Sequence, residues 1–117
     1  THAQANAVNN RGEIVGISPA NGIRVYHAVR WGQQGNVVDL GTLPGGTASD
    51  ANGVNDLGMV AGGSDDGTNT YAVIWNRDGT PTALPGANGD ATAISDTGFI
   101  VGVADDAAGD NVAVMWR

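Results

Sequence analysis

The chain has 117 residues, of which 41% are hydrophobic, 15% are charged and 19 are glycine. Asp and Glu number 12 against five Lys and Arg, and the resulting net charge of −7 excludes the basic surface that nucleic-acid binding requires. There is no cysteine, which excludes disulfides and thiol chemistry, and no apolar run reaches the roughly 18 residues of a membrane-spanning helix.

One sequence unit occurs three times along the chain, which predicts a repeat fold. Its first segment begins with Ala and ends with Gly, and its copies are 5–16, 51–62 and 91–102. Its second segment ends in the three Trp of the chain, at 27–31, 71–75 and 112–116. Its third, Leu-Pro-Gly, lies at 43–45 and 84–86. We predict one domain, 1–117, with repeats at about 4–46, 51–86 and 91–117, the third without its last strand.

Alternating side chains and turn residues predict four strands in each complete unit, taken here in chain order. The first strands are expected at about 4–9, 51–55 and 91–95, and the second at about 13–18, 59–64 and 99–104. Turns at 10–12, 56–58 and 96–98 join them, because Asn or Asp bonds its own backbone and Gly accepts a positive φ. Third strands follow at about 25–31, 70–76 and 111–116, and fourth strands at about 36–43 and 80–84.

The third strand of each unit carries an apolar face that predicts core packing. In the first copy His27, Val29 and Trp31 share one face, and the other copies keep that face mostly apolar. Tryptophans can stack on sugars in lectins, but one Trp per repeat within an alternating strand favours a core position.

A meander of four strands in about 40 residues has the size of one β-propeller blade. We therefore predict an all-β, propeller-type array of four-stranded antiparallel blades, with a β-trefoil of three pseudo-symmetric repeats as the alternative. Three blades do not close the usual ring of four to eight. We therefore expect either that the chain is part of a longer array of such blades or that copies self-associate through exposed blade edges to give a homo-oligomer.

Three motifs together carry a family resemblance. The patterns A-x-x-V-N-x-x-G-x-I-V-G, H-A-x-x-W and D-L-G-T-L-P-G-G, found here at 5–16, 27–31 and 39–46, resemble the HAF family of probable extracellular repeats. The resemblance implies a bacterial protein, secreted or on the cell surface, with a propeller-like fold and no assigned activity. The second and third copies depart from it, with Tyr71 and Val112 in place of the histidine.

The acidic loops between the second and third strands hold the candidate ligand-binding residues Asp65, Asp66, Asp105 and Asp106. Oxygen-rich loops can bind Ca²⁺, but neither loop has the spacing or closing Glu of a known calcium loop, so solvated turns are favoured. His2 and His27 lack partners at metal-ligand spacing. We expect no metal site, no cofactor and no catalytic residue.

The function expected from these features is non-enzymatic: an extracellular or cell-surface module with a structural or interaction role. A surface protein or a glycan is the expected partner beside self-association, and neither nucleic acid nor a membrane span is expected. A carbohydrate-binding lectin is the first alternative. A secreted hydrolase or lyase is the second, and it requires an acid or histidine cluster outside the repeat pattern.

Overall fold

The structure, a computed structural model, describes residues 3–20, 25–32 and 35–117. Over these residues the chain is all-β, with three antiparallel sheets, none of which closes into a barrel. In each sheet the strands pair in sequence order, which is a meander. The strands are β1 (Gln4–Val8), β2 (Ile14–Pro19), β3 (Tyr26–Trp31) and β4 (Val37–Gly41) in the first sheet; β5 (Ser49–Val54), β6 (Val60–Asp65), β7 (Thr70–Trp75) and β8 (Pro81–Ala83) in the second; and β9 (Asp90–Ile94), β10 (Ile100–Asp105) and β11 (Asn111–Trp116) in the third.

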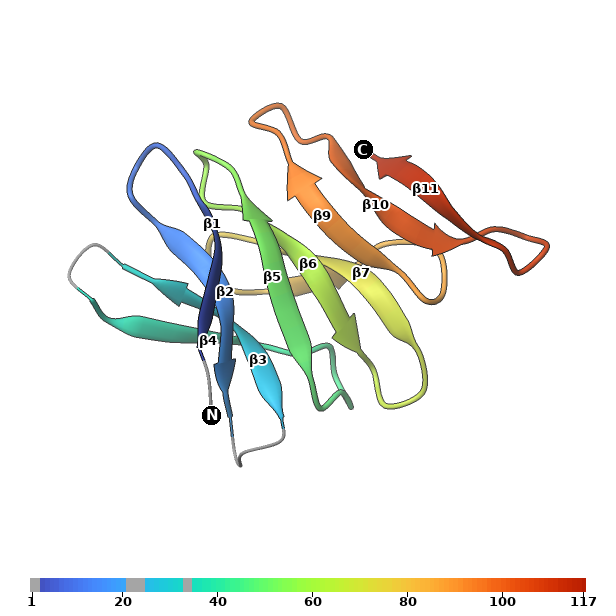
Figure 1. The fold of residues 1–117 in the computed structure, drawn as a ribbon, viewed down its shortest axis with the longest axis horizontal. Helices are drawn as coiled ribbons and strands as arrows, with labels where there is room; N and C mark the ends of the chain where they lie inside the picture. Colours follow the sequence, from blue (N-terminus) through green and yellow to red (C-terminus); the bar gives the residue numbers. More distant parts are fainter. Residues whose placement is uncertain (1–2, 21–24, 33–34) are drawn as a thin grey trace.

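Each sheet contains one copy of the repeated sequence, and the three sheets lie side by side in chain order (Figure 1). Every strand begins and ends within two residues of its predicted bounds. The first strands of neighbouring sheets contact one another, β1 with β5 and β5 with β9. Within the described ranges no helix is long and apolar enough to cross a membrane.

The three tryptophans occupy the same position in their sheets, as the repeat predicts. Trp31 lies opposite Ile14, Trp75 opposite Val60 and Trp116 opposite Ile100. Their surroundings differ in exposure: the indole of Trp75 is fully buried, whereas those of Trp31 and Trp116 are partly exposed.

A backbone irregularity explains the glycine that ends the first segment of each repeat. The first strand of every sheet has a bulge in its pairing with the second strand. The bulge sets a carbonyl of the first strand directly over Gly16, Gly62 or Gly102. A Cβ at any of these glycines would overlap the carbonyl oxygen of Gln4, Asp50 or Asp90, respectively. Only glycine leaves room for the bulged strand.

The core is divided into two layers, one at each junction between sheets. Between the first and second sheets Val15, Ala28, Val60, Val73 and Trp75 are buried together. Between the second and third sheets the buried cluster is formed by Ala61, Ala72, Ala91 and Ile100. The sequence prediction assigned one apolar face to the third strand. That was incomplete, because the middle sheet is covered on both sides, and the small residues of the second face are as buried as the large ones.

Candidate functional site

The four acidic loop residues singled out from the sequence are held by hydrogen bonds near their own turns. Asp66 accepts from the backbone N–H groups of Thr68 and Asn69, and Asp106 accepts in the same way from two N–H groups of its own loop. The pKa of the Asp66 carboxyl is lowered by these backbone donors. Both residues thus serve as turn caps.

Asp65 and Asp105, one residue earlier, tie their strand ends to the loop that precedes the same sheet. The N–H groups of Thr47 and Ala48 both donate to Asp65 Oδ1, at 2.9 and 2.8 Å. Asp105 instead accepts from the side-chain amide of Asn88, at 2.6 Å. These contacts tie both carboxylates to the loop that precedes their own sheet.

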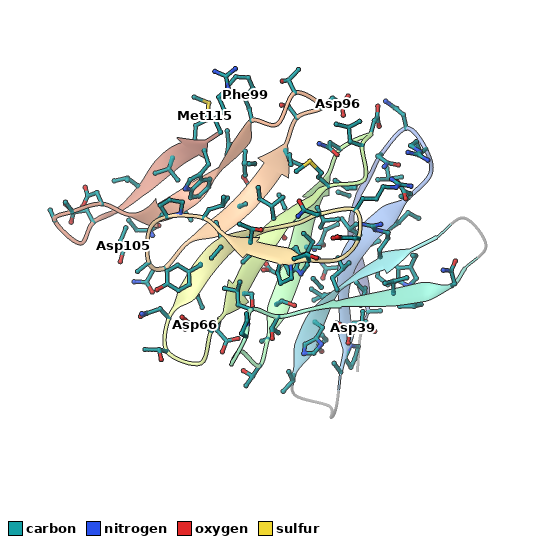
Figure 2. The ribbon with its side chains drawn as sticks, turned by 180° about the vertical axis from the view of Figure 1, so that it is seen from behind. Asp39, Asp66, Asp96, Phe99, Asp105 and Met115 are labelled. Carbon is teal, nitrogen blue, oxygen red and sulfur yellow. The ribbon has the colours of Figure 1, made fainter. Side chains whose placement is uncertain are left out.

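The structure does not gather the four acids into one site. Figure 2 shows Asp66 and Asp105 apart, Asp66 in the loop after β6 and Asp105 at the end of β10. Over the described residues no group of three or more His, Asp or Glu side chains is arranged to hold a metal ion. His27 contacts the Asp39 carboxylate through Nδ1 at 3.0 Å and the Thr47 carbonyl through Nε2 at 3.2 Å, whereas His2 lies outside the described residues. His27 and Asp39 therefore join the H-A-x-x-W and D-L-G motifs in one sheet.

A polar network that the sequence did not reveal runs from sheet to sheet. Asn9 and Asn55, which end the first strands, cap their own turns with Oδ1; in the second sheet this oxygen accepts from the N–H groups of Leu57 and Met59. The same side chains donate through Nδ2 to the next sheet, Asn9 to the carbonyl of Asn55 and Asn55 to the carbonyl of Ser95. One amide therefore closes a turn and joins two sheets.

The next residue in each turn extends this network, and here the prediction was wrong. Asp56 and Asp96 were expected to bond their own turns, but each accepts from the preceding sheet: Asp56 Oδ1 from the N–H of Asn10, and Asp96 Oδ1 from the N–H of Asp56, both at 2.8 Å. The backbone and side-chain donors of Asn10 lower the pKa of Asp56. A second row lies along the first strands, where Asn6 and Asn52 donate to carbonyls of the next sheet.

A cavity of about 280 Å³ lies at the junction of the second and third sheets, and its lining includes the candidate residue Asp65 together with Asp50 and Asp90. Asp50 comes from β5 and Asp90 from β9, and they hold the same position in the repeat. One oxygen of each lies within 3.0 Å of the point that a Cβ on Gly63 would occupy. The Asn52 amide lies between them, 3.3 Å from Asp50 Oδ2 and 3.1 Å from Asp90 Oδ1.

The surroundings of Asp50 and Asp90 disfavour the negatively charged form of each carboxyl group. Burial, and then the negative charge of Asp50, raise the pKa of Asp90 to about 6, while the amide of Asn52 acts in the opposite direction. Burial also raises the pKa of Asp50. A pair of this kind can take up a proton in mildly acidic solution. The signal in the sequence is the Asp-Ala pair at the start of two first strands, Asp50-Ala51 and Asp90-Ala91, 40 residues apart.

This pair predicts that the free energy of unfolding falls as pH rises from about 4 to about 6. Asp90 binds its proton more tightly in the folded chain than in the unfolded chain, so deprotonation favours unfolding. After allowance for solvent screening we expect a loss of about 1 kcal/mol. Urea unfolding at a series of pH values measures it. Carboxylates with lowered pKa, such as Asp65 and Asp66, act in the opposite direction and below this window.

The matched variant for this measurement is Asp90→Asn, which keeps the size of the side chain and removes the titration. Its unfolding free energy should vary less between pH 4 and 6 and exceed that of the parent chain at pH 7. Equal pH profiles for the two chains would contradict the assignment of the effect to Asp90.

The three tryptophans differ in their access to a sugar ring, and Trp31 is partly exposed. Trp75 is fully buried, and the partly exposed Trp116 donates from Nε1 to the Pro85 carbonyl at 3.0 Å, which ties it to the second sheet. The most extensive polar arrangement over the described residues is thus the network between sheets, and what it does is hold the sheets together. A scan against family models finds no match, and no curated protein or solved structure is significantly similar to the chain.

Proposed function

We propose that the chain is a non-enzymatic, propeller-type repeat module that serves as a structural or interaction unit outside a bacterial cell. The proposal joins the motif resemblance to the HAF repeats with the arrangement of the sheets. It assigns the polar side chains to cohesion between the units and leaves the variable loops to contact a partner.

The proposal rests on the hydrogen bonds that the polar side chains make within the repeat. Asn9, Asn55, Asp56 and Asp96 all bond across a junction between sheets. Asp66 and Asp106 cap turns. Side chains of the types that catalysis uses are thus engaged in holding the repeat together, which favours a scaffold over an enzyme.

The arrangement of the sheets supports blades of a propeller type over a β-trefoil. Each sheet is a separate meander, and β1, β5 and β9 contact one another in turn, as the innermost strands of blades around an axis do. A β-trefoil requires that strands from all three repeats close into one barrel. Over the described residues the three sheets are separate and pack through their faces, which does not favour that closure.

The location is tested by labelling cells of the source organism with antibody raised against the chain. Intact, unpermeabilised cells or their culture medium should contain the antigen, and a cytosolic enzyme serves as the control for leakage. Antigen found only after permeabilisation would overturn the extracellular assignment. A glycan array tests the lectin alternative in parallel. Saturable binding to one glycan class would replace a structural role with carbohydrate recognition.

A further inference from the structure

The chain contains the same face-to-face junction twice. At each junction we call the sheet that comes earlier in the chain the leading sheet and the other the following sheet. The leading sheet contributes one residue from its second strand and one from its third: Val15 and Ala28 at the first junction, and Ala61 and Ala72 at the second. The following sheet covers them with equivalent residues at both junctions; these are Ala51, Val60 and Trp75, and then Ala91, Ile100 and Trp116. The two junctions differ in sequence but place equivalent residues in contact. The repeat therefore determines both faces of the interface.

The third sheet exposes to solvent the face that a leading sheet uses at the internal junctions. Val101 is the equivalent of Val15 and Ala61, yet it is 43% exposed where they are 0% exposed. Met115 on the neighbouring strand, opposite Val101, is 65% exposed. Figure 2 shows Met115 on the third sheet, far from the first sheet. Exposed apolar residues grouped on one sheet face mark an interaction surface.

The first sheet presents the complementary face. Its residues at the covering positions are Ala5, Ile14 and Trp31, which are exposed or only partly buried. Val8, opposite Ile14, is 63% exposed, whereas its equivalent in the second sheet, Val54, is 9% exposed. The two ends of one molecule therefore carry the two halves of the interface that its own sheets make internally.

We propose that a second copy of this chain stacks its first sheet on the third sheet of the first copy, in the register of the internal junctions. The partner follows from continuity with those junctions, because the covering residues are present on the chain itself. Such a head-to-tail contact closes a ring or continues as a filament, depending on the rotation between copies. This inference rests on the proposed role as a repeat module and names its partner.

The charges at the proposed junction between copies favour a second copy of the chain as the partner. At the internal junction between the second and third sheets, Asp50 and Asp90 face each other. The equivalent residue of the first sheet is Gln4, so a second copy sets a neutral amide, not a third carboxylate, near Asp90. Val101, Val103 and Met115 contribute exposed apolar side chains to the contact beside Asp90.

The junction between copies lacks two donors that the internal junctions have. Thr92 and Ser95 stand where Asn52 and Asn55 donate across to the third sheet. Association between copies should therefore be weaker than the packing of sheets within one chain, and reversible.

Sedimentation velocity over a concentration series tests the contact. The parent chain should change from monomer to larger species as concentration rises, and Val101→Asp should raise the dissociation constant by about tenfold or more. Leu57→Asp, at a 59% exposed turn residue outside both faces, is the control with the same charge change and should leave association unaltered. Met115→Asp replaces the first variant if Val101→Asp does not fold. A parent chain that stays monomeric at the highest concentrations overturns the proposal.

A mixing experiment distinguishes head-to-tail stacking from a symmetric contact between two third sheets. Val8→Asp blocks the first sheet and Val101→Asp the third, so each variant alone should remain monomeric. A mixture should form a 1:1 dimer that grows no further, since one intact face remains on each variant. Self-association of Val8→Asp alone, as strong as that of the parent, would overturn the head-to-tail arrangement.

Restoring a missing donor provides a gain-of-function test. In Ser95→Asn the side-chain amide can donate to the Asn9 carbonyl of a second copy, as Asn55 donates to the Ser95 carbonyl within the chain. The dissociation constant should fall by about fivefold. An unchanged or higher constant would overturn the proposed register. Failure of these tests leaves the extracellular assignment standing, because cell labelling does not depend on association.

Discussion

Gly62→Ala is expected to lower the free energy of unfolding by about 3 to 5 kcal/mol. Gly62 is buried in β6, in the middle of the central sheet, and an added Cβ would overlap the Asp50 carbonyl oxygen. Because that atom is backbone, no rotamer change relieves the overlap. The bulge in β5 must be pushed outward, and with it Ala51, which is buried at the junction with the first sheet. Urea unfolding at pH 7 measures the loss, provided that the slope with denaturant is unchanged.

Gly98→Ala is the matched control, because it adds the same methyl group where space is open. Gly98 has a φ of 92°, and a Cβ there would have no atom within 4 Å. Its cost should therefore be confined to backbone strain, about 1 to 2 kcal/mol. If the two variants lose equal stability, close approach of the bulge is not the reason for glycine at position 62.

The strands could be predicted from the sequence because three copies of one pattern constrain each other. A single run such as 13–18 is ambiguous, but its match to 59–64 and 99–104 fixes the spacing of the turns. The positions of the tryptophans followed from the same comparison. Because side chains along a strand alternate between its two faces, equivalent positions lie on equivalent faces. Trp31, Trp75 and Trp116 therefore had to lie on the same face of their sheets.

The contacts between sheets were not predictable, because they depend on how one sheet is rotated and displaced over the next. Local turn chemistry favoured Asp56 as a cap of its own turn. The stacking instead brings Asp56 beside Asn10 and assigns the cap to Asn55. Asp50 and Asp90 are 40 residues apart and meet only through that displacement. A repeat pattern marks equivalent positions, but which of them touch is decided by packing in three dimensions.

The network also explains why small residues occupy so much of the core. Neighbouring sheets must approach closely enough for Asn55 to reach the Ser95 carbonyl at 3.0 Å. Ala61, Ala72 and Ala91 fill the same junction. Larger side chains there would separate the sheets and lengthen the hydrogen bonds. The expected consequence is that the apolar packing and the polar network depend on each other.

Trp75→Ala is expected to cost about 3 to 5 kcal/mol, which is comparable with the whole stability of a small domain. Trp75 is fully buried between the first and second sheets, in contact with the cluster around Val60 and Val73. Its Nε1 makes no hydrogen bond to the described residues, so the loss comes from packing and from the cavity left behind. Urea unfolding again provides the measurement.

Trp31→Ala removes the same side chain from the same repeat position and supplies the control. Trp31 is partly exposed on the outer face of the first sheet, so the cost in a dilute monomer should be smaller, about 1 to 2 kcal/mol. At concentrations where copies associate, Trp31 becomes the counterpart of Trp75 at the junction between molecules, and its cost should rise toward that of Trp75. Equal costs for the two variants in dilute solution would mean that the stacking of sheets does not determine the burial of this position.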